Sequence, residues 1–113
     1  MYMNGWGVAP DEAEGARWYR RAADAGSAYA MRYYGAWLEH GTGVAQDYTE
    51  AMRWYRKAVE AGNADAMVDL GNLFEKGLGV SKNLPEAVSW YRKAAAQGSQ
   101  IGRQALDRLG VQP

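Results

Sequence analysis

The stretch from Leu70 to Gly98, LGNLFEKGLGVSKNLPEAVSWYRKAAAQG, carries a pattern that repeats along the chain. Moving it by 36 residues brings Trp90 onto Trp54, and a second step brings it onto Trp18. The same shift aligns further sets of identical residues without a gap: Gly5, Gly41 and Gly77; Gly7, Gly43 and Gly79; Val8, Val44 and Val80; Glu14, Glu50 and Glu86; Tyr19, Tyr55 and Tyr91; Arg20, Arg56 and Arg92; Ala22, Ala58 and Ala94; Gly26, Gly62 and Gly98. One offset that satisfies all these positions identifies a tandem repeat, in which each copy is one supersecondary unit.

The tryptophan-containing segment of each copy has the pattern of an amphipathic helix. In the middle copy Asp47 is a capping residue and Glu50 stands three residues later, as in a capping box. Small and aromatic residues then follow at i, i+3, i+4 and i+7 spacing, which predicts one buried stripe: Ala51, Trp54, Tyr55 and Ala58. Gly62 is placed to end this helix. By the same register Trp18, Trp54 and Trp90 are all predicted to lie in the core.

The next segment predicts a second helix, which Asn63 caps in the middle of the chain and Ser27 and Ser99 cap in the other copies. Its inner face is formed by two equivalent sets: Ala30, Met31, Tyr34, Gly35 and Leu38, then Ala66, Met67, Leu70, Gly71 and Phe74. A glycine in mid-helix costs about 1 kcal/mol relative to alanine. Gly35 and Gly71 therefore predict a close approach of the partner helix.

These signals predict an all-α chain with helices over 12–25, 28–40, 48–61, 64–76, 84–97 and 100–109. A length of 113 residues fits one domain. The 13 basic and 13 acidic residues cancel and interleave, so neither a nucleic-acid nor an anionic-membrane partner is expected. The chain has no stretch of about 20 apolar residues and no signal-peptide pattern. It has no cysteine, which excludes disulfides and thiolate chemistry.

The repeat resembles the Sel-one-like repeat of the tetratricopeptide superfamily, on its 36-residue length, its Gly-x-Gly-Val loop and its Ala-x-x-Trp-Tyr-x-Lys-Ala signature. The resemblance covers essentially the whole chain. It implies a right-handed α-solenoid of antiparallel helix pairs, about three repeats long. The single domain, 1–113, would comprise a partial repeat over 1–26, full repeats over 27–62 and 63–98, and a C-terminal capping helix over 99–113.

The resemblance also implies a non-catalytic scaffold that binds a protein or peptide partner, with the first helix of each pair lining a concave groove. Positions outside the repeat signature form a stripe on these helices. Those residues are Tyr29, Arg32, Tyr33, Ala36 and His40; Asp65, Val68, Asp69, Asn72 and Lys76; and Ile101, Gln104, Ala105 and Arg108. Tyrosine and arginine are enriched at binding hot spots. The alternative is a solvated face whose aromatic residues pack between repeats.

Two other functions remain open. Cysteine-rich relatives have been described as penicillin-binding or β-lactamase-like, but a serine hydrolase of that kind requires Ser-x-x-Lys, which none of the four serines begins. His40 has no second histidine or thiol beside it in the sequence, so no catalytic residue, metal site or cofactor is predicted. Acidic residues at 11, 12 and 14 are better explained by helix capping than by a cation site. The chain is alternatively a fragment of a larger adaptor.

The two ends of the repeat array depart from the pattern. The segment MYMNGWGV matches only the tail of a first helix, so the face of the helix over 12–25 is expected to lie open, flanked by Trp6. Upstream residues, a second copy of the chain or a partner protein would cover this face, and self-association is the preferred interpretation. At the other end Asp107 replaces the glycine of Gly35 and Gly71, and Arg103 replaces methionine, which is typical of a terminal cap.

Overall fold

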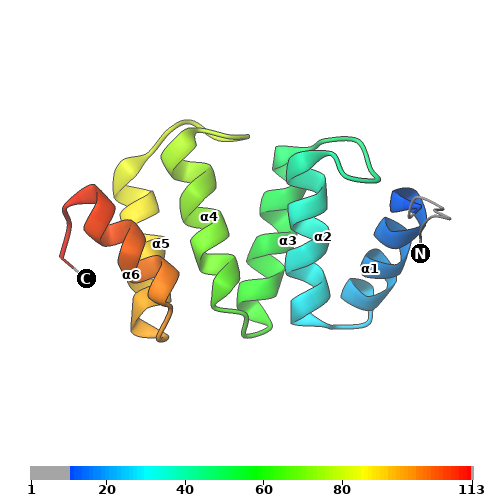
Figure 1. The fold of residues 1–113 in the computed structure, drawn as a ribbon, viewed down its shortest axis with the longest axis horizontal. Helices are drawn as coiled ribbons and strands as arrows, with labels where there is room; N and C mark the ends of the chain where they lie inside the picture. Colours follow the sequence, from blue (N-terminus) through cyan, green and yellow to red (C-terminus); the bar gives the residue numbers. More distant parts are fainter. Residues whose placement is uncertain (1–10, 113) are drawn as a thin grey trace, which may run out of the picture.

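The computed structural model describes residues 11–112, and within that range it contains six α-helices and no strand (Figure 1). They are α1 (Glu12–Asp24), α2 (Ala28–His40), α3 (Tyr48–Glu60), α4 (Asp65–Lys76), α5 (Leu84–Ala96) and α6 (Gln100–Leu109). The predicted all-α fold of about three repeats is confirmed. Five helices start at the predicted residue, and α4 starts one residue late. Each helix ends at the predicted residue or one residue before it.

Side-chain caps start five of the six described helices, and at α4 Asn63 makes the same bond from one residue before the N-cap, Ala64. A side-chain oxygen of each capping residue accepts a hydrogen bond from the backbone N–H three residues later, at 3.0 to 3.2 Å. The capping residues are Asp11, Ser27, Asp47, Asn63, Asn83 and Ser99. Gly62, at φ +99°, turns the chain after α3 in a conformation that other residues rarely adopt. Local sequence therefore sets where each helix begins and ends.

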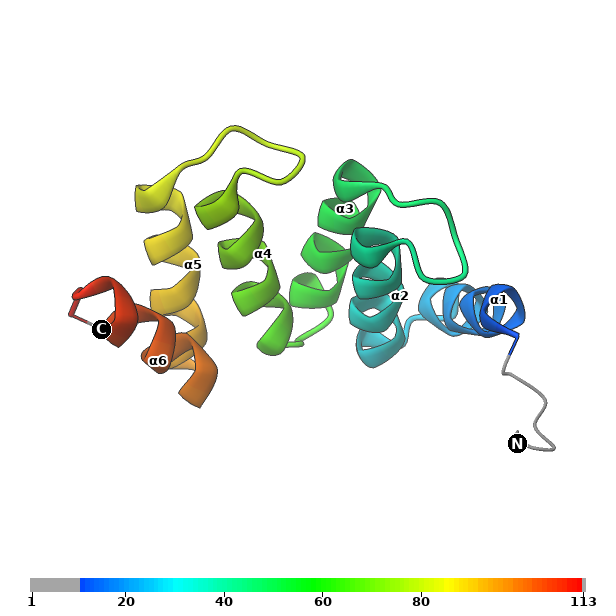
Figure 2. The same cartoon turned by 45° about the horizontal axis from the view of Figure 1, so that its top comes forward.

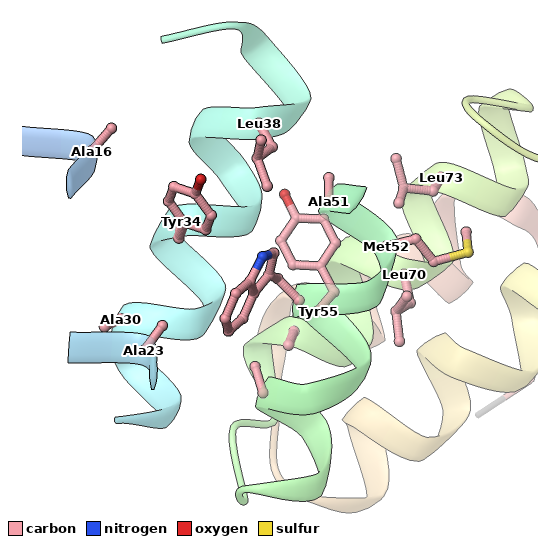
Figure 3. Close-up of a cluster of buried hydrophobic side chains, with 13 residues drawn as sticks. Ala16, Ala23, Ala30, Tyr34, Leu38, Ala51, Met52, Tyr55, Leu70 and Leu73 are labelled. Atoms are coloured by element: carbon pink, nitrogen blue, oxygen red, sulfur yellow. The ribbon is translucent and has the colours of Figure 1, made fainter. Parts of the chain in front are cut away.

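The core lies between the helices of each pair, most extensively between α2 and α3 and between α4 and α5. The ring of Tyr55 packs against Gly35, where an added Cβ would be 2.8 Å from a ring carbon. Tyr91 approaches Gly71 in the same way, at 2.5 Å from such a Cβ. Figure 3 shows Tyr55 beside Leu38 and Tyr34 in this cluster. The predicted close approach of the partner helix at these glycines is confirmed, and the structure shows that a tyrosine ring of that helix occupies the space.

The pairs follow one another in a row, so the described part of the chain is elongated (Figures 1 and 2). Its principal extents are 49 × 25 × 25 Å. The two ends of this row are different. Among the described helices, α1 at one end packs mainly on α2, and α6 at the other packs mainly on α5. None of the helices in residues 11–112 is long and apolar enough to cross a membrane.

The prediction that all three repeat tryptophans lie in the core is wrong for Trp18. Trp54 is 4% exposed because Tyr34 of α2 covers it, with ring centroids 5.5 Å apart. Trp18 is 61% exposed, because no described helix lies on that face of α1. The expectation that this face is open is confirmed for the described residues. Trp6, which was expected to flank it, lies outside them.

Candidate protein-binding surface

Two ion pairs join α2, α4 and α6, which are the first helices of successive helix pairs. Arg32 Nε of α2 lies 2.6 Å from Asp69 Oδ2 of α4. Arg108 of α6 donates two hydrogen bonds to Glu75 of α4, at 2.7 Å to Oε2 and 2.8 Å to Oε1. The other ion pairs between residues 11 and 112 are internal to single helices. The α2, α4 and α6 helices are therefore connected by charge along one side of the array.

The Arg32–Asp69 pair is only partly open to solvent. Burial raises the pKa of the Asp69 carboxyl more than the Arg32 guanidinium lowers it. Burial lowers the pKa of Arg32, but the hydrogen bond and charge of Asp69 outweigh that effect and the pKa is raised. A carboxylate that has lost much of its water depends on its cationic partner, because removing the partner would leave a buried charge uncompensated. It positions the α2–α4 junction.

Glu75 is the centre of a second polar cluster. The hydroxyl of Tyr91 lies 2.6 Å from Glu75 Oε1 and 2.7 Å from Asn72 Oδ1. Hydrogen bonds from Arg108, and then from Tyr91, lower the pKa of Glu75 to about 2. Burial and the nearby carboxylate raise the pKa of Tyr91, so it stays a neutral donor. Tyr55 donates to Glu39 in the same register, at 2.6 Å.

A shallow hollow of about 300 Å³ lies between α4 and α6. It is lined by six residues, all on the predicted stripe: Val68, Asn72, Ile101, Gln104, Ala105 and Arg108. Val68 and Ala105 are buried and form an apolar base, whereas Ile101 and Gln104 are exposed at the rim. The hollow therefore presents an apolar centre with amide and guanidinium groups around it.

Aromatic residues line the stripe at its α2 end. The hydroxyls of Tyr29 and Tyr33 lie 3.0 Å apart, with ring centroids at 4.7 Å. Tyr33 also stacks on Tyr19 of α1, at 5.6 Å, and Tyr19 meets Trp37 edge-on at 5.1 Å. Tyr29 itself is exposed. This cluster joins α1 to α2 and leaves one tyrosine open to solvent.

The remaining stripe residues are more scattered. Ala36 is half-buried, Asp65 is exposed in the first turn of α4, and His40 and Lys76 are exposed in the last turns of α2 and α4. Sequence reasoning missed Glu39 and Glu75, although they stand 36 residues apart. Their 36-residue spacing could have identified them as repeat positions. Their role could not be predicted from the sequence, because it depends on tyrosines of the following helix.

The serine and acidic residues considered for catalysis or metal binding include several that cap helices. No group of three or more histidine and acidic side chains between residues 11 and 112 is arranged to hold a metal ion. Ser27 and Ser99 are occupied as helix caps. The acidic cluster at the start of α1 likewise acts in capping, since Asp11 accepts the backbone N–H of Glu14 at 3.2 Å.

Comparison with known proteins identifies the family to which the chain belongs. The Sel1 repeat model matches residues 1–27, 28–63 and 64–99. A search of curated proteins finds no match. The chain is similar in structure to a protective antigen of uropathogenic Escherichia coli that displays an SLR fold, with 36% identity over 91% of this chain and a TM-score of 0.82. It is also similar to a Sel1 repeat protein from Oxalobacter formigenes, with 41% identity over 87% of this chain and a TM-score of 0.76.

A third similar structure is cysteine-rich protein B of Helicobacter pylori, with 30% identity over 80% of this chain, 68% of that chain and a TM-score of 0.73. The chain spans only 22% of the E. coli antigen and 40% of the Oxalobacter protein. Repeat arrays of this kind differ in length because each unit contacts mainly its neighbours. The chain belongs to the Sel1 repeat family, whose members are typically protein-interaction scaffolds.

Proposed function

We propose that this protein is a non-catalytic scaffold that binds a peptide segment of a partner protein along α2, α4 and α6. The observation that carries the proposal is the hollow between α4 and α6, with its apolar base and polar rim. An apolar side chain of the partner would enter above Val68 and Ala105. The side-chain amide of Gln104 would then reach the partner's backbone, and the exposed Tyr29 would add a second contact one repeat away.

The experiment is a pull-down with the whole chain as bait, followed by affinity measurements with the identified partner. Ile101→Glu places a charge at the rim of the hollow and should weaken binding about tenfold or more. Leu84→Glu is the matched control, because Leu84 is also an exposed apolar residue but lies on α5. Equal affinity of both variants and the wild type would show that the partner does not use the hollow.

We also infer that the protein has no hydrolase activity. The serines that cap α2 and α6 have no lysine or histidine partner among their hydrogen bonds, and a serine nucleophile requires an adjacent base. Turnover of nitrocefin, esters and peptides should therefore equal the solvent rate. A burst of nitrocefin hydrolysis that disappears when a single serine is replaced would contradict this inference.

Self-association through the open end of α1 is the last part of the proposal. The open face carries an apolar hollow of about 540 Å³, lined by Gly15, Trp18, Tyr19, Ala22 and Trp37. Four of these residues hold the repeat positions of the buried stripe of α3. Exposed apolar patches of this kind mark association sites.

A further inference from the structure

The exposed face of α1 combines an apolar centre with charges of opposite sign at its two ends. Glu14 lies one turn before Trp18, and Arg21 lies one turn after it. Together with Arg17 these residues line a small hollow of about 120 Å³ beside the apolar one. The guanidinium of Arg21 sits 5.1 Å from the centre of the Trp18 ring. The face therefore runs from negative through aromatic to positive along one helix.

The other repeats show what normally covers such a face. In them α2 covers the stripe of α3, and α4 covers the stripe of α5. Each covering helix offers a glycine to the tyrosine ring and a glutamate to its hydroxyl. In the same register Met3 stands at the position of the glutamates Glu39 and Glu75.

Head-to-tail stacking of a second copy does not fit the exposed face of α1. In that arrangement α6 of one copy would lie on α1 of the next, as α2 lies on α3. Asp107 of α6 occupies the register of Gly35 and Gly71, where even a Cβ would be within 3 Å of the tyrosine ring. The carboxylate of Asp107 is exposed and would be buried against Tyr19 without a counter-charge.

A two-fold arrangement has no such obstacle. We propose that two copies of the chain associate through α1 in antiparallel orientation, with the two Trp18 side chains at the axis; this proposal rests on the self-association proposed above. Antiparallel pairing about Trp18 sets Glu14 opposite Arg21 of the partner subunit, and the symmetry repeats the pair. Arg17 remains at the rim. The antiparallel α1 dipoles also attract each other.

Charge reversal tests the arrangement directly. Glu14→Arg would face Arg21 of the partner subunit and Arg21→Glu would face Glu14 of the partner subunit, so each variant alone should dimerise about tenfold more weakly than the wild type. An equimolar mixture of the two variants restores both opposite-charge pairs, and its dimer should recover. Sedimentation velocity over a concentration series measures all of these, with circular dichroism to show that each variant folds.

Arg20→Glu is the matched control, since Arg20 lies on the opposite side of α1 and should leave the dimer unchanged. A wild-type chain that stays monomeric at high concentration, with Trp18 shielded from a soluble quencher, would overturn self-association itself. A dimer that ignores both charge reversals, or a mixture that fails to recover, would overturn the two-fold arrangement and leave self-association standing. Weaker dimers of both single variants, together with recovery of the dimer in their mixture, would establish the antiparallel contact.

Discussion

At the scale of single residues, Trp54 and Trp18 hold the same position in successive repeats but have different neighbours. Trp54 lies between α2 and α3, against Tyr34, and Lys57 covers its outer side with Nζ 4.5 Å from the ring centre. Trp54→Ala should therefore lower the free energy of unfolding by about 3–5 kcal/mol. A short repeat array has little stability to spare, so this variant should be largely unfolded. Thermal unfolding followed by circular dichroism measures the loss.

Trp18→Ala is the natural comparison, because the same atoms are removed from a 61% exposed site. Its cost should stay below about 1 kcal/mol, as is usual for a surface substitution. Melting temperatures that fall equally in both variants would contradict the difference in burial. An unchanged melting temperature in Trp54→Ala would show that this tryptophan is not in the core.

Gly71 is a second residue whose role depends on a neighbour. Replacing a mid-helix glycine with alanine should gain about 1 kcal/mol from helix propensity. At Gly71 the added Cβ would instead be 2.5 Å from the Tyr91 ring, so overpacking should cost about 1–3 kcal/mol. Asp107→Ala, at the same register but in the exposed outer face of α6, should show no loss. Urea unfolding of both variants measures the change in the free energy of unfolding. A Gly71→Ala variant more stable than the wild type would refute the contact.

At the scale of helices, sequence predicted what is decided locally. Helix starts follow from caps such as Asp47 and Asn83, whose hydrogen bonds span three residues. Ends followed from glycines such as Gly62. The stripe on α4 and α6 was also predictable, because the i, i+3, i+4 spacing fixes which residues share a face. These signals required no knowledge of the neighbouring helix.

What sequence did not predict depends on contacts between helices. Glu75 was missed because its partners, Tyr91 and Arg108, lie 16 and 33 residues away in the chain. Trp18 was assigned to the core because register alone says nothing about whether a covering helix is present. Residue type and spacing therefore gave the face of the candidate site, whereas its polar clusters needed the tertiary arrangement.

The ion pair between Glu75 of α4 and Arg108 of α6 makes the free energy of unfolding depend on pH. The pKa of Glu75 is lowered to about 2 from its ordinary value of 4.5. A lowered pKa means that the folded state favours the carboxylate, so this contribution is complete above the ordinary value and is lost as pH falls toward 2. Wild type should exceed Glu75→Gln in stability at pH 7, and the difference should shrink at about pH 3.

The control for this prediction removes the partner. In an Arg108→Gln background Glu75 loses the hydrogen bonds that lower its pKa most, so the effect of Glu75→Gln should depend much less on pH. Urea unfolding of the four chains at both pH values gives the comparison as a double-mutant cycle. A wild-type advantage that persists undiminished at low pH would show that the ion pair is not responsible.

At the scale of the whole molecule, the first and the last described helix present different outer faces. The outer face of α6 is polar at Arg103 and Asp107, which suits a surface that meets solvent. The outer face of α1 is apolar at Trp18 and Tyr19, which suits a surface that is covered. In the proposed dimer the two α1 faces cover each other and both α6 faces stay in solvent, so association would close at two copies and not grow into a filament.

The last prediction concerns how stability is distributed along this array. Among the described helices α1 packs mainly on α2, whereas α3 packs on both α2 and α4. Since each unit of a solenoid is held mainly by its neighbours, α1 should open locally at a free energy at least about 1.4 kcal/mol lower than α3. Amide hydrogen exchange in α1 should then be about tenfold faster or more, as read by mass spectrometry. Raising the protein concentration should slow exchange in α1 and leave α6 unchanged, because only α1 would be covered in the dimer. Equal protection of α1 and α3 at every concentration would mean that the array opens as one cooperative unit, with its exposed end as firmly held as its centre.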